Sequence, residues 1–359
     1  MNASPSKLLG VQYMRALASG MVLFGHVLAE TEHYLKIDMP FGWVPWTRGV
    51  DIFFVISGFI ILVSSQKYFE APGGVRVFCR KRFTRVVPLY WLFTTLMLAV
   101  LLILPSGAKQ TQLDWGQVIT SYLFIPYERY DGRAAPILSL GWTLNFEIFF
   151  YAVFALALFL PRRIGPLSVV VLMTVWAALG ALIPGMADIT VLRVWSNPLI
   201  LEFCMGVLLG QLYVHHSLQQ QDQPEHNKAR NRVGWALLAT GFGLLCLLNQ
   251  IDGLPRWIAS GFPATMMVAS IVFFYTPHNE PGRWARIGGL LGDSSYALYL
   301  SHRFFLRALT MVIVPLLPAT ITGGLLFTGV ACSVAIAGSL VVYVWIERPL
   351  LRLTSGKPR

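Results

Sequence analysis

The first long apolar stretch of the chain carries two polar residues whose types could do chemistry. It runs from Leu8 to Glu30 and contains Arg15 and His26, a permanent cation and an imidazole that titrates near neutral pH. At about 100° per residue, the eleven positions between them return to within about 20° of the same direction, roughly 16 Å further along a helix. Glu30, four residues after His26, falls on the same face.

A polar stripe of this kind has to face other protein or water, because ionisable groups are expensive in hydrocarbon. The stripe therefore predicts a buried site that spans two depths of the bilayer. A structural alternative exists for each residue: Arg15 extends to the lipid headgroups, and His26 hydrogen-bonds a neighbouring helix.

Composition identifies the elements that must position these residues. The 359 residues are 55% hydrophobic and 13% charged, with a mean hydropathy of +0.61, which excludes an ordinary soluble domain. We expect an all-α, polytopic transmembrane bundle that forms a single membrane domain over residues 1–359. The net charge of +11 lies in short loops between apolar runs, so it indicates a bilayer and no nucleic acid. The four cysteines stand singly, which predicts neither disulfides nor a metal site.

Ten segments are long and apolar enough to cross a bilayer as helices. They are residues 8–28, 50–66, 86–104, 144–160, 166–184, 197–214, 233–250, 257–276, 287–306 and 321–346. The run 118–125 is too short to cross and is expected to be re-entrant or interfacial. With the amino terminus inside, the inner segments hold roughly twice as many Lys and Arg residues as the outer ones, so both termini should be cytoplasmic.

This topology places several polar side chains near one level, at the outer ends of the spans. They are two histidines, three carboxylates and two tyrosines: His26, Glu30, Asp51, Glu147, Tyr151, Tyr299 and His302. Each has a structural alternative, such as a helix cap, a packing ion pair or an aromatic belt. Because a membrane-buried acid costs about 2.5–3.5 kcal/mol on insertion scales, several at one depth favour a functional cavity.

The inner side carries a different feature, a basic cluster that runs into the third span. Arg82 and Arg85 lie one helical turn apart there, and guanidinium groups so arranged can hold phosphate bidentately. The alternative is that the cluster fixes the topology and contacts anionic lipid.

In combination, these pieces resemble the acyltransferase type 3 family, the integral membrane O-acyltransferases that modify bacterial polysaccharides. Six ordered motifs between residues 8 and 352 carry the resemblance: Arg15 with His26, the stretch 49–59, the Arg82 and Arg85 pair, Trp142-Thr143-Leu144 ahead of Glu147, the stretch 295–302, and Glu347-Arg348-Pro349. The likeness is greatest to the exopolysaccharide-modifying branch. Asn145 departs from the Ser-Val type step that many relatives have before the acid.

The resemblance implies a donor and its binding groups. Acyl-CoA would bind from the cytoplasm, with its phosphates near Arg82 and Arg85 and its pantetheine arm passing Arg15. Acetyl-CoA is the expected donor, with succinyl-CoA as the alternative, and no bound cofactor is implied. The acceptor would be a hydroxyl of a polysaccharide or lipid-linked saccharide. The chain would then reside in the bacterial cytoplasmic (inner) membrane as a multi-pass protein.

The resemblance also implies catalytic roles at the outer level. His26 would take a proton from the acceptor hydroxyl, either directly or after carrying the acyl group itself. Asp51, Glu147 or Glu30 would orient its imidazole. Further supporting or acceptor contacts are expected from Tyr151, Tyr299 and His302.

Two other classes of protein remain as alternatives. A proton-coupled transporter would also bury His, Asp and Glu, but along a path through both leaflets. An assembly subunit of a polysaccharide export machine would have no use for Arg15, Arg82 or Arg85. Turnover of acyl-CoA distinguishes an acyltransferase from a transporter, and mutation of those arginines should leave an assembly subunit working.

Overall fold

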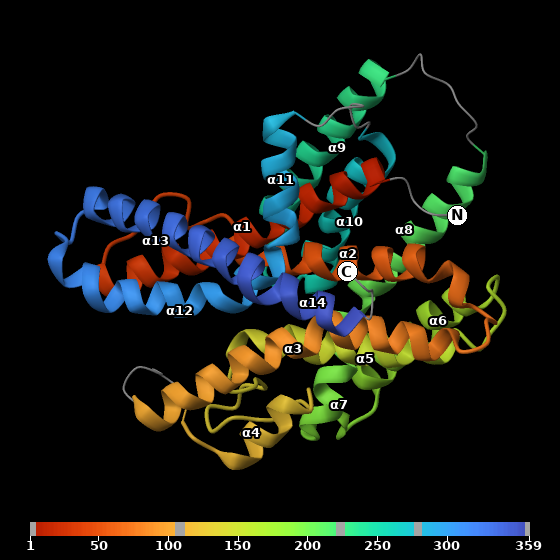
Figure 1. The fold of residues 1–359 in the computed structure, drawn as a ribbon, viewed down its shortest axis with the longest axis horizontal. Helices are drawn as coiled ribbons and strands as arrows, with labels where there is room; N and C mark the ends of the chain where they lie inside the picture. The colour runs from red at the N-terminus through yellow and green to blue at the C-terminus, as the bar shows by residue number, and fades with distance from the viewer. Residues whose placement is uncertain (1–4, 105–111, 220–226, 276–281, 356–359) are drawn as a thin grey trace. The chain divides into compact units, whose positions relative to one another are not determined.

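The chain is predominantly helical in the part that a computed structural model describes, residues 5–104, 112–219, 227–275 and 282–355. No β-strand occurs in these ranges, where an isolated bridge joins Glu128 to Ala134. The all-α prediction is therefore confirmed. The α-helices, coloured along the chain in Figure 1, are α1 Pro5–Leu35, α2 Gly49–Ser65, α3 Gly74–Ile103, α4 Trp115–Tyr122, α5 Trp142–Ala157, α6 Gly165–Leu182, α7 Thr190–Trp195, α8 Ile200–Gln219, α9 Asn227–Leu248, α10 Phe262–Ala269, α11 Arg283–Asp293, α12 Ser295–Ile313, α13 Ile321–Val342 and α14 Arg348–Ser355.

Nine helical segments of the described ranges are long and apolar enough to cross a membrane. They are Trp46–Tyr68, Gly74–Ile103, Ser139–Ala157, Gly165–Leu182, Thr190–His216, Ala229–Leu248, Trp257–Phe274, Ser295–Leu316 and Ile321–Leu353. These overlap nine of the ten predicted spans, and the chain is a multi-pass membrane protein. The other predicted span lies in α1, an unbroken helix of 31 residues, whose polar residues at positions 15, 26 and 30 lower its mean hydropathy.

The ninth predicted span, 287–306, is wrong in its first half. The helix α11 ends at Asp293, and the next membrane-crossing segment begins at Ser295. The first half of this segment contains Gly288, Gly289 and Gly292, which the sequence analysis included in an apolar span. Gly292 instead allows close packing of α11 on α1, because a Cβ there would collide with the backbone carbonyl of Gln12. The short run 118–125 overlaps α4, which ends at Tyr122 and whose eight residues are too few to cross a bilayer.

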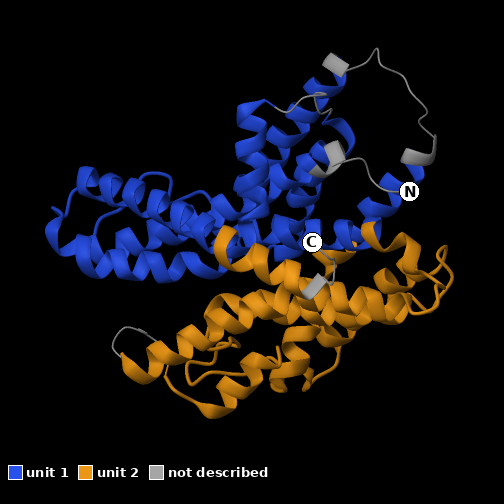
Figure 2. Ribbon diagram, in the orientation of Figure 1, with its two compact units in different colours: residues 1–63, 205–343 blue, residues 64–204, 344–359 orange. Residues whose placement is uncertain are grey.

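The described residues divide into two compact units, coloured separately in Figure 2. Unit 1 comprises Met1–Val63 and Met205–Tyr343, and unit 2 comprises Ser64–Cys204 and Val344–Arg359. Each unit is described below by itself.

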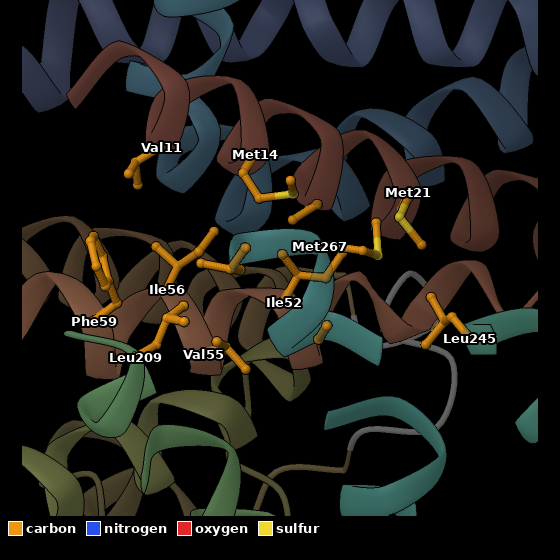
Figure 3. Packing of buried hydrophobic residues seen from close by; sticks show 13 residues of the cluster. Val11, Met14, Met21, Ile52, Val55, Ile56, Phe59, Leu209, Leu245 and Met267 are labelled. Carbon is orange, nitrogen blue, oxygen red and sulfur yellow. The ribbon is translucent and has the colours of Figure 1, made fainter. Parts of the chain in front are cut away.

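The larger core of unit 1 is built from apolar side chains of five helices (Figure 3). The buried residues labelled there are Val11, Met14 and Met21 of α1, Ile52, Val55, Ile56 and Phe59 of α2, Leu209 of α8, Leu245 of α9 and Met267 of α10. Because this cluster packs α2 against its neighbours, it fixes the first turn of α2, which carries Asp51.

A second core of unit 1 joins α1, α12 and α13, which lie side by side in Figure 1. Leu23 and Val27 of α1 contribute to this cluster, together with Leu298 and Leu306 of α12. The first two flank His26 in sequence, and the last two stand one turn before and one turn after His302. The cluster therefore holds the two histidine-bearing helices in register.

Unit 2 is organised around α3, which contacts α4, α5 and α14. Its Phe78 is 1% exposed and stacks on Phe154 of α5, with ring centroids 5.5 Å apart. The same ring meets Tyr151 edge-on at 6.4 Å. This aromatic packing fixes the part of α3 that leads into Arg82 and Arg85.

We predict that Gly206→Ala destabilises the protein. In α8 of unit 1, a Cβ at Gly206 would meet the backbone carbonyl of Val55 and lie 2.8 Å from the amide nitrogen of Phe59. Overpacking against backbone costs about 1–3 kcal/mol, so the thermal unfolding midpoint in detergent should fall. Gly243→Ala is the matched control, since nothing lies within 4 Å of its added Cβ. Equal midpoints for the two variants would contradict this packing.

Candidate active site

Two histidines meet where α1 and α12 pack together. Nδ1 of His26 lies 3.1 Å from Nε2 of His302, and the ring centroids are 5.1 Å apart with a tilt of 31°. His302 is 1% exposed, whereas His26 is half-buried. The other nitrogen of His302, Nδ1, lies 3.0 Å from the carbonyl oxygen of Leu298 and 2.9 Å from that of Tyr299.

Aromatic rings extend this pair toward α2. The ring of Tyr299, which is 8% exposed, has its centroid 6.4 Å from that of His302. On its other side it meets Phe53 of α2 edge-on, at 6.3 Å. The structure thus brings together His26, Tyr299 and His302, which the sequence had placed at one level.

Glu30 lies one turn beyond His26 on the same helix and is 7% exposed. Its Oε1 accepts a long hydrogen bond of 3.4 Å from the hydroxyl of Thr310 in α12. That hydroxyl lies nearer to the carbonyl of Leu306, at 2.8 Å. Glu30 is therefore a second polar group between α1 and α12, close in sequence to the histidine pair.

Asp51 has an arginine as its partner. Its Oδ1 accepts from Nε of Arg256 at 2.9 Å and its Oδ2 from Nη2 at 2.8 Å. The aspartate side chain is fully buried, and the arginine side chain is 27% exposed. Both carboxylate oxygens are thus held by one guanidinium in a bidentate pair, the strong form of this contact.

Helix geometry explains why Asp51 does not meet the histidines. Phe53, two residues later on α2, is the residue that contacts Tyr299. Positions two apart on a helix differ in direction by about 200°, so Asp51 faces away from that contact. The partner of His26 is His302, and Asp51, one of the three carboxylates that the sequence offered as orienting groups, is bound to Arg256.

Arg15 is half-buried on α1 and donates from Nη1 to Oε1 of Gln12 at 3.2 Å. Since α1 is unbroken from Pro5 to Leu35, the spacing that aligns Arg15 with His26 and Glu30 on one helical face is realised.

The other predicted site residues belong to unit 2. Tyr151 is 7% exposed and donates its hydroxyl proton to Oε1 of Glu147, one turn earlier on α5. Phe78, which packs on Tyr151, also lies under the guanidinium of Arg82, whose Cζ is 5.8 Å from the ring centroid. Nε of Arg82 is buried and has no hydrogen-bond partner among the described residues.

Arg85 is held in place by an acid that the sequence analysis gave no role. Its Nη1 lies 2.7 Å from Oε1 of Glu347, and the glutamate side chain is 1% exposed. The sequence analysis used Glu347 only as part of a motif and did not single out Arg256. The available signal was position: Arg256 flanks an apolar segment on the side of the membrane to which the topology assigns Asp51.

A metal site is not formed by the described residues, among which no group of three His, Cys, Asp or Glu side chains converges. Within unit 1, the chemistry available is that of a half-buried imidazole hydrogen-bonded to a buried one. Such a pair can accept, hold and return a proton.

Comparison with known proteins identifies the class of chemistry. A family model described as an acyltransferase domain matches residues 8–344. The chain belongs to this acyltransferase family. The match runs through the sequence of both units, and it sets aside the transporter and assembly-subunit alternatives.

One curated relative is similar over nearly its whole length. The chain is 33% identical over 335 residues to the exopolysaccharide production protein ExoZ of Rhizobium meliloti strain 1021, covering 91% of this chain and 94% of that protein. No solved structure gives a significant match to this member of the acyltransferase family.

We predict that Arg256→Ala destabilises unit 1, because it strands a fully buried carboxylate. Breaking a buried ion pair costs about 3–5 kcal/mol, and the low end applies here since the guanidinium is partly exposed. The thermal unfolding midpoint should fall by several degrees. The midpoint of the double variant Asp51→Asn/Arg256→Gln should fall less than that of Arg256→Ala, because no buried charge is left unpaired.

The control is a pair of the same type at the surface. Arg133 lies 2.6 Å from Asp131, with 62% of its side chain exposed, so Arg133→Ala should cost at most about 1 kcal/mol. If Arg256→Ala lowers the unfolding midpoint no more than Arg133→Ala does, the Asp51–Arg256 pair does not stabilise unit 1 as predicted.

Proposed function

We propose that this protein is a membrane O-acyltransferase that moves an acetyl group from acetyl-CoA to a hydroxyl of an exported polysaccharide. The observation that carries the proposal is the buried contact between His26 and His302 in a chain of an acyltransferase family. The polysaccharide acceptor is suggested by the name of the relative, an exopolysaccharide production protein.

The proposed reaction uses His26 as the general base. As the acceptor hydroxyl oxygen attacks the thioester carbon, its proton passes to the imidazole of His26. The new C–O bond forms, the C–S bond breaks, and the imidazolium returns the proton to the departing CoA sulfur. The products are an O-acetyl ester and free CoA thiol, so the imidazole ends the cycle unchanged.

The donor phosphates are assigned to the arginines of α3. A guanidinium group offers several N–H donors in a planar fork that matches phosphate. Nε of Arg82 has no hydrogen-bond partner among the described residues, and Glu347 positions Arg85. Phosphate binding would engage donors that the apolar surroundings of Phe78 do not satisfy.

The cellular setting follows from the same proposal. A multi-pass protein with both termini in the cytoplasm would take acyl-CoA from the cytoplasm and act on a saccharide being exported. The bacterial cytoplasmic (inner) membrane is where these two substrates meet.

The test is release of CoA thiol from acetyl-CoA by purified protein in nanodiscs, with the host's exopolysaccharide as acceptor. We predict that His26→Ala lowers turnover by about 10²–10⁴-fold, the contribution typical of a general base. His33→Ala is the matched control, because His33 is an exposed histidine on the same helix. Thiol release that survives His26→Ala, or that falls equally in the control, would overturn the assignment.

The arginine assignment is tested in the same assay. We predict that Arg82→Ala raises the KM for acetyl-CoA by about tenfold, the effect of losing roughly 1.4 kcal/mol of binding, with little change in kcat. The exposed Arg80 of α3 provides the control Arg80→Ala. Comparison of acetyl-CoA with succinyl-CoA identifies the acyl group, and turnover of succinyl-CoA alone would replace acetyl in the proposal.

A further inference from the structure

We propose that His302 is a positioning residue that holds His26 in the tautomer protonated at Nδ1, which leaves Nε2 of His26 as the basic nitrogen. The tautomer follows from hydrogen-bond geometry alone. Its catalytic consequence rests on the proposed function.

The proton of His302 is located by its backbone contacts. Nδ1 of His302 lies 3.0 Å and 2.9 Å from the carbonyl oxygens of Leu298 and Tyr299. Carbonyl oxygens only accept hydrogen bonds. A lone pair on this nitrogen would therefore face two oxygens at contact distance, so Nδ1 of His302 must carry the proton.

The other ring nitrogen of His302, Nε2, faces His26 of α1. A neutral imidazole has one N–H and one acceptor nitrogen, so Nε2 of His302 is the acceptor. It lies 3.1 Å from Nδ1 of His26. An acceptor requires a donor at this distance, and Nδ1 of His26 must therefore carry the proton of the neutral ring.

Nε2 of His26 is the remaining ring nitrogen of the pair. With its proton on Nδ1, neutral His26 has its lone pair on Nε2. This nitrogen has no hydrogen-bond partner among the residues that the structure describes, and the His26 side chain is half-buried rather than sealed. Nε2 is thus the atom available to a substrate hydroxyl.

The hydrogen bond to His302 strengthens when that atom takes up a proton. When Nε2 of His26 accepts a proton, its Nδ1–H bond to His302 becomes a charge-assisted hydrogen bond, which is stronger than the neutral one. His302 keeps its own proton between the two carbonyls and so stays in place. The buried ring thereby performs, without a net charge, the orienting task that a carboxylate performs in a catalytic triad.

The first measurement is ¹⁵N NMR of the full chain in nanodiscs with labelled histidine, at a pH where the pair is neutral. His26 is assigned by the resonances that disappear in His26→Asn. We expect a pyridine-type Nε2 and a pyrrole-type Nδ1 for His26. A protonated Nε2 in the neutral ring would overturn the proposal, whether or not the protein is active.

The second measurement compares two substitutions of His302. The amide oxygen of His302→Gln can still accept from Nδ1 of His26, whereas His302→Leu offers no acceptor. We expect His302→Leu to move the neutral His26 toward the Nε2–H tautomer and to lower kcat by at least tenfold with an unchanged KM for acetyl-CoA, and His302→Gln to retain most of both properties. His33→Leu on the exposed face of α1 is the control.

The outcomes separate this proposal from the proposed function. The expected tautomer without thiol release in any variant supports the positioning role and contradicts the acyltransfer mechanism. If His302→Gln and His302→Leu are monodisperse and show the same His26 tautomer and the same loss of kcat, the positioning role is wrong.

Discussion

The candidate site of unit 1 depends on one hydrogen bond between two imidazoles in an apolar helical bundle. An imidazole in such surroundings needs a polar partner, because an unsatisfied buried donor or acceptor costs about 1–3 kcal/mol. His302 satisfies both of its nitrogens at once, with two carbonyls of its own helix and with His26. The leucines of the α1–α12–α13 core set the spacing of the two helices. The apolar core and the hydrogen bond therefore require the same register of α1 and α12. In this register Nε2 of His26 is the ring nitrogen that takes no part in the contact between the histidines.

The arginines that pair with buried acids have a different task from the histidines. Arg256 neutralises Asp51 in unit 1, and Arg85 neutralises Glu347 in unit 2. Both acids would be too expensive to bury as isolated charges. With Asp51 fully engaged, the orienting group of His26 is a neutral ring rather than a carboxylate. A neutral partner avoids the cost of a further charge among apolar helices while still fixing the direction of the nitrogen that we propose to be catalytic.

The sequence predicted the elements far better than the contacts between them. Apolar run length and loop charge were enough for an all-α multi-pass bundle, and helical spacing was enough to align Arg15, His26 and Glu30. The predicted span 287–306 was wrong in its first half, because in sequence the glycines that allow close helix packing look the same as glycines inside an apolar span. The sequence left Asp51, Glu147 and Glu30 as alternative orienting groups for His26, since a one-dimensional depth argument carries no information on direction around a helix. The partner Arg256 is about two hundred positions away, and no local pattern encodes that pairing.

The most direct test is a cryo-EM structure of the protein in nanodiscs with acetonyl-CoA, an analogue whose carbonyl group cannot be transferred. The account predicts that this carbonyl carbon lies one hydroxyl group away from Nε2 of His26, about 5–6 Å, while Nδ1 of His26 remains bonded to His302. A bound analogue whose acyl end lies far from His26, or a His26 ring turned so that Nε2 faces His302, would contradict it.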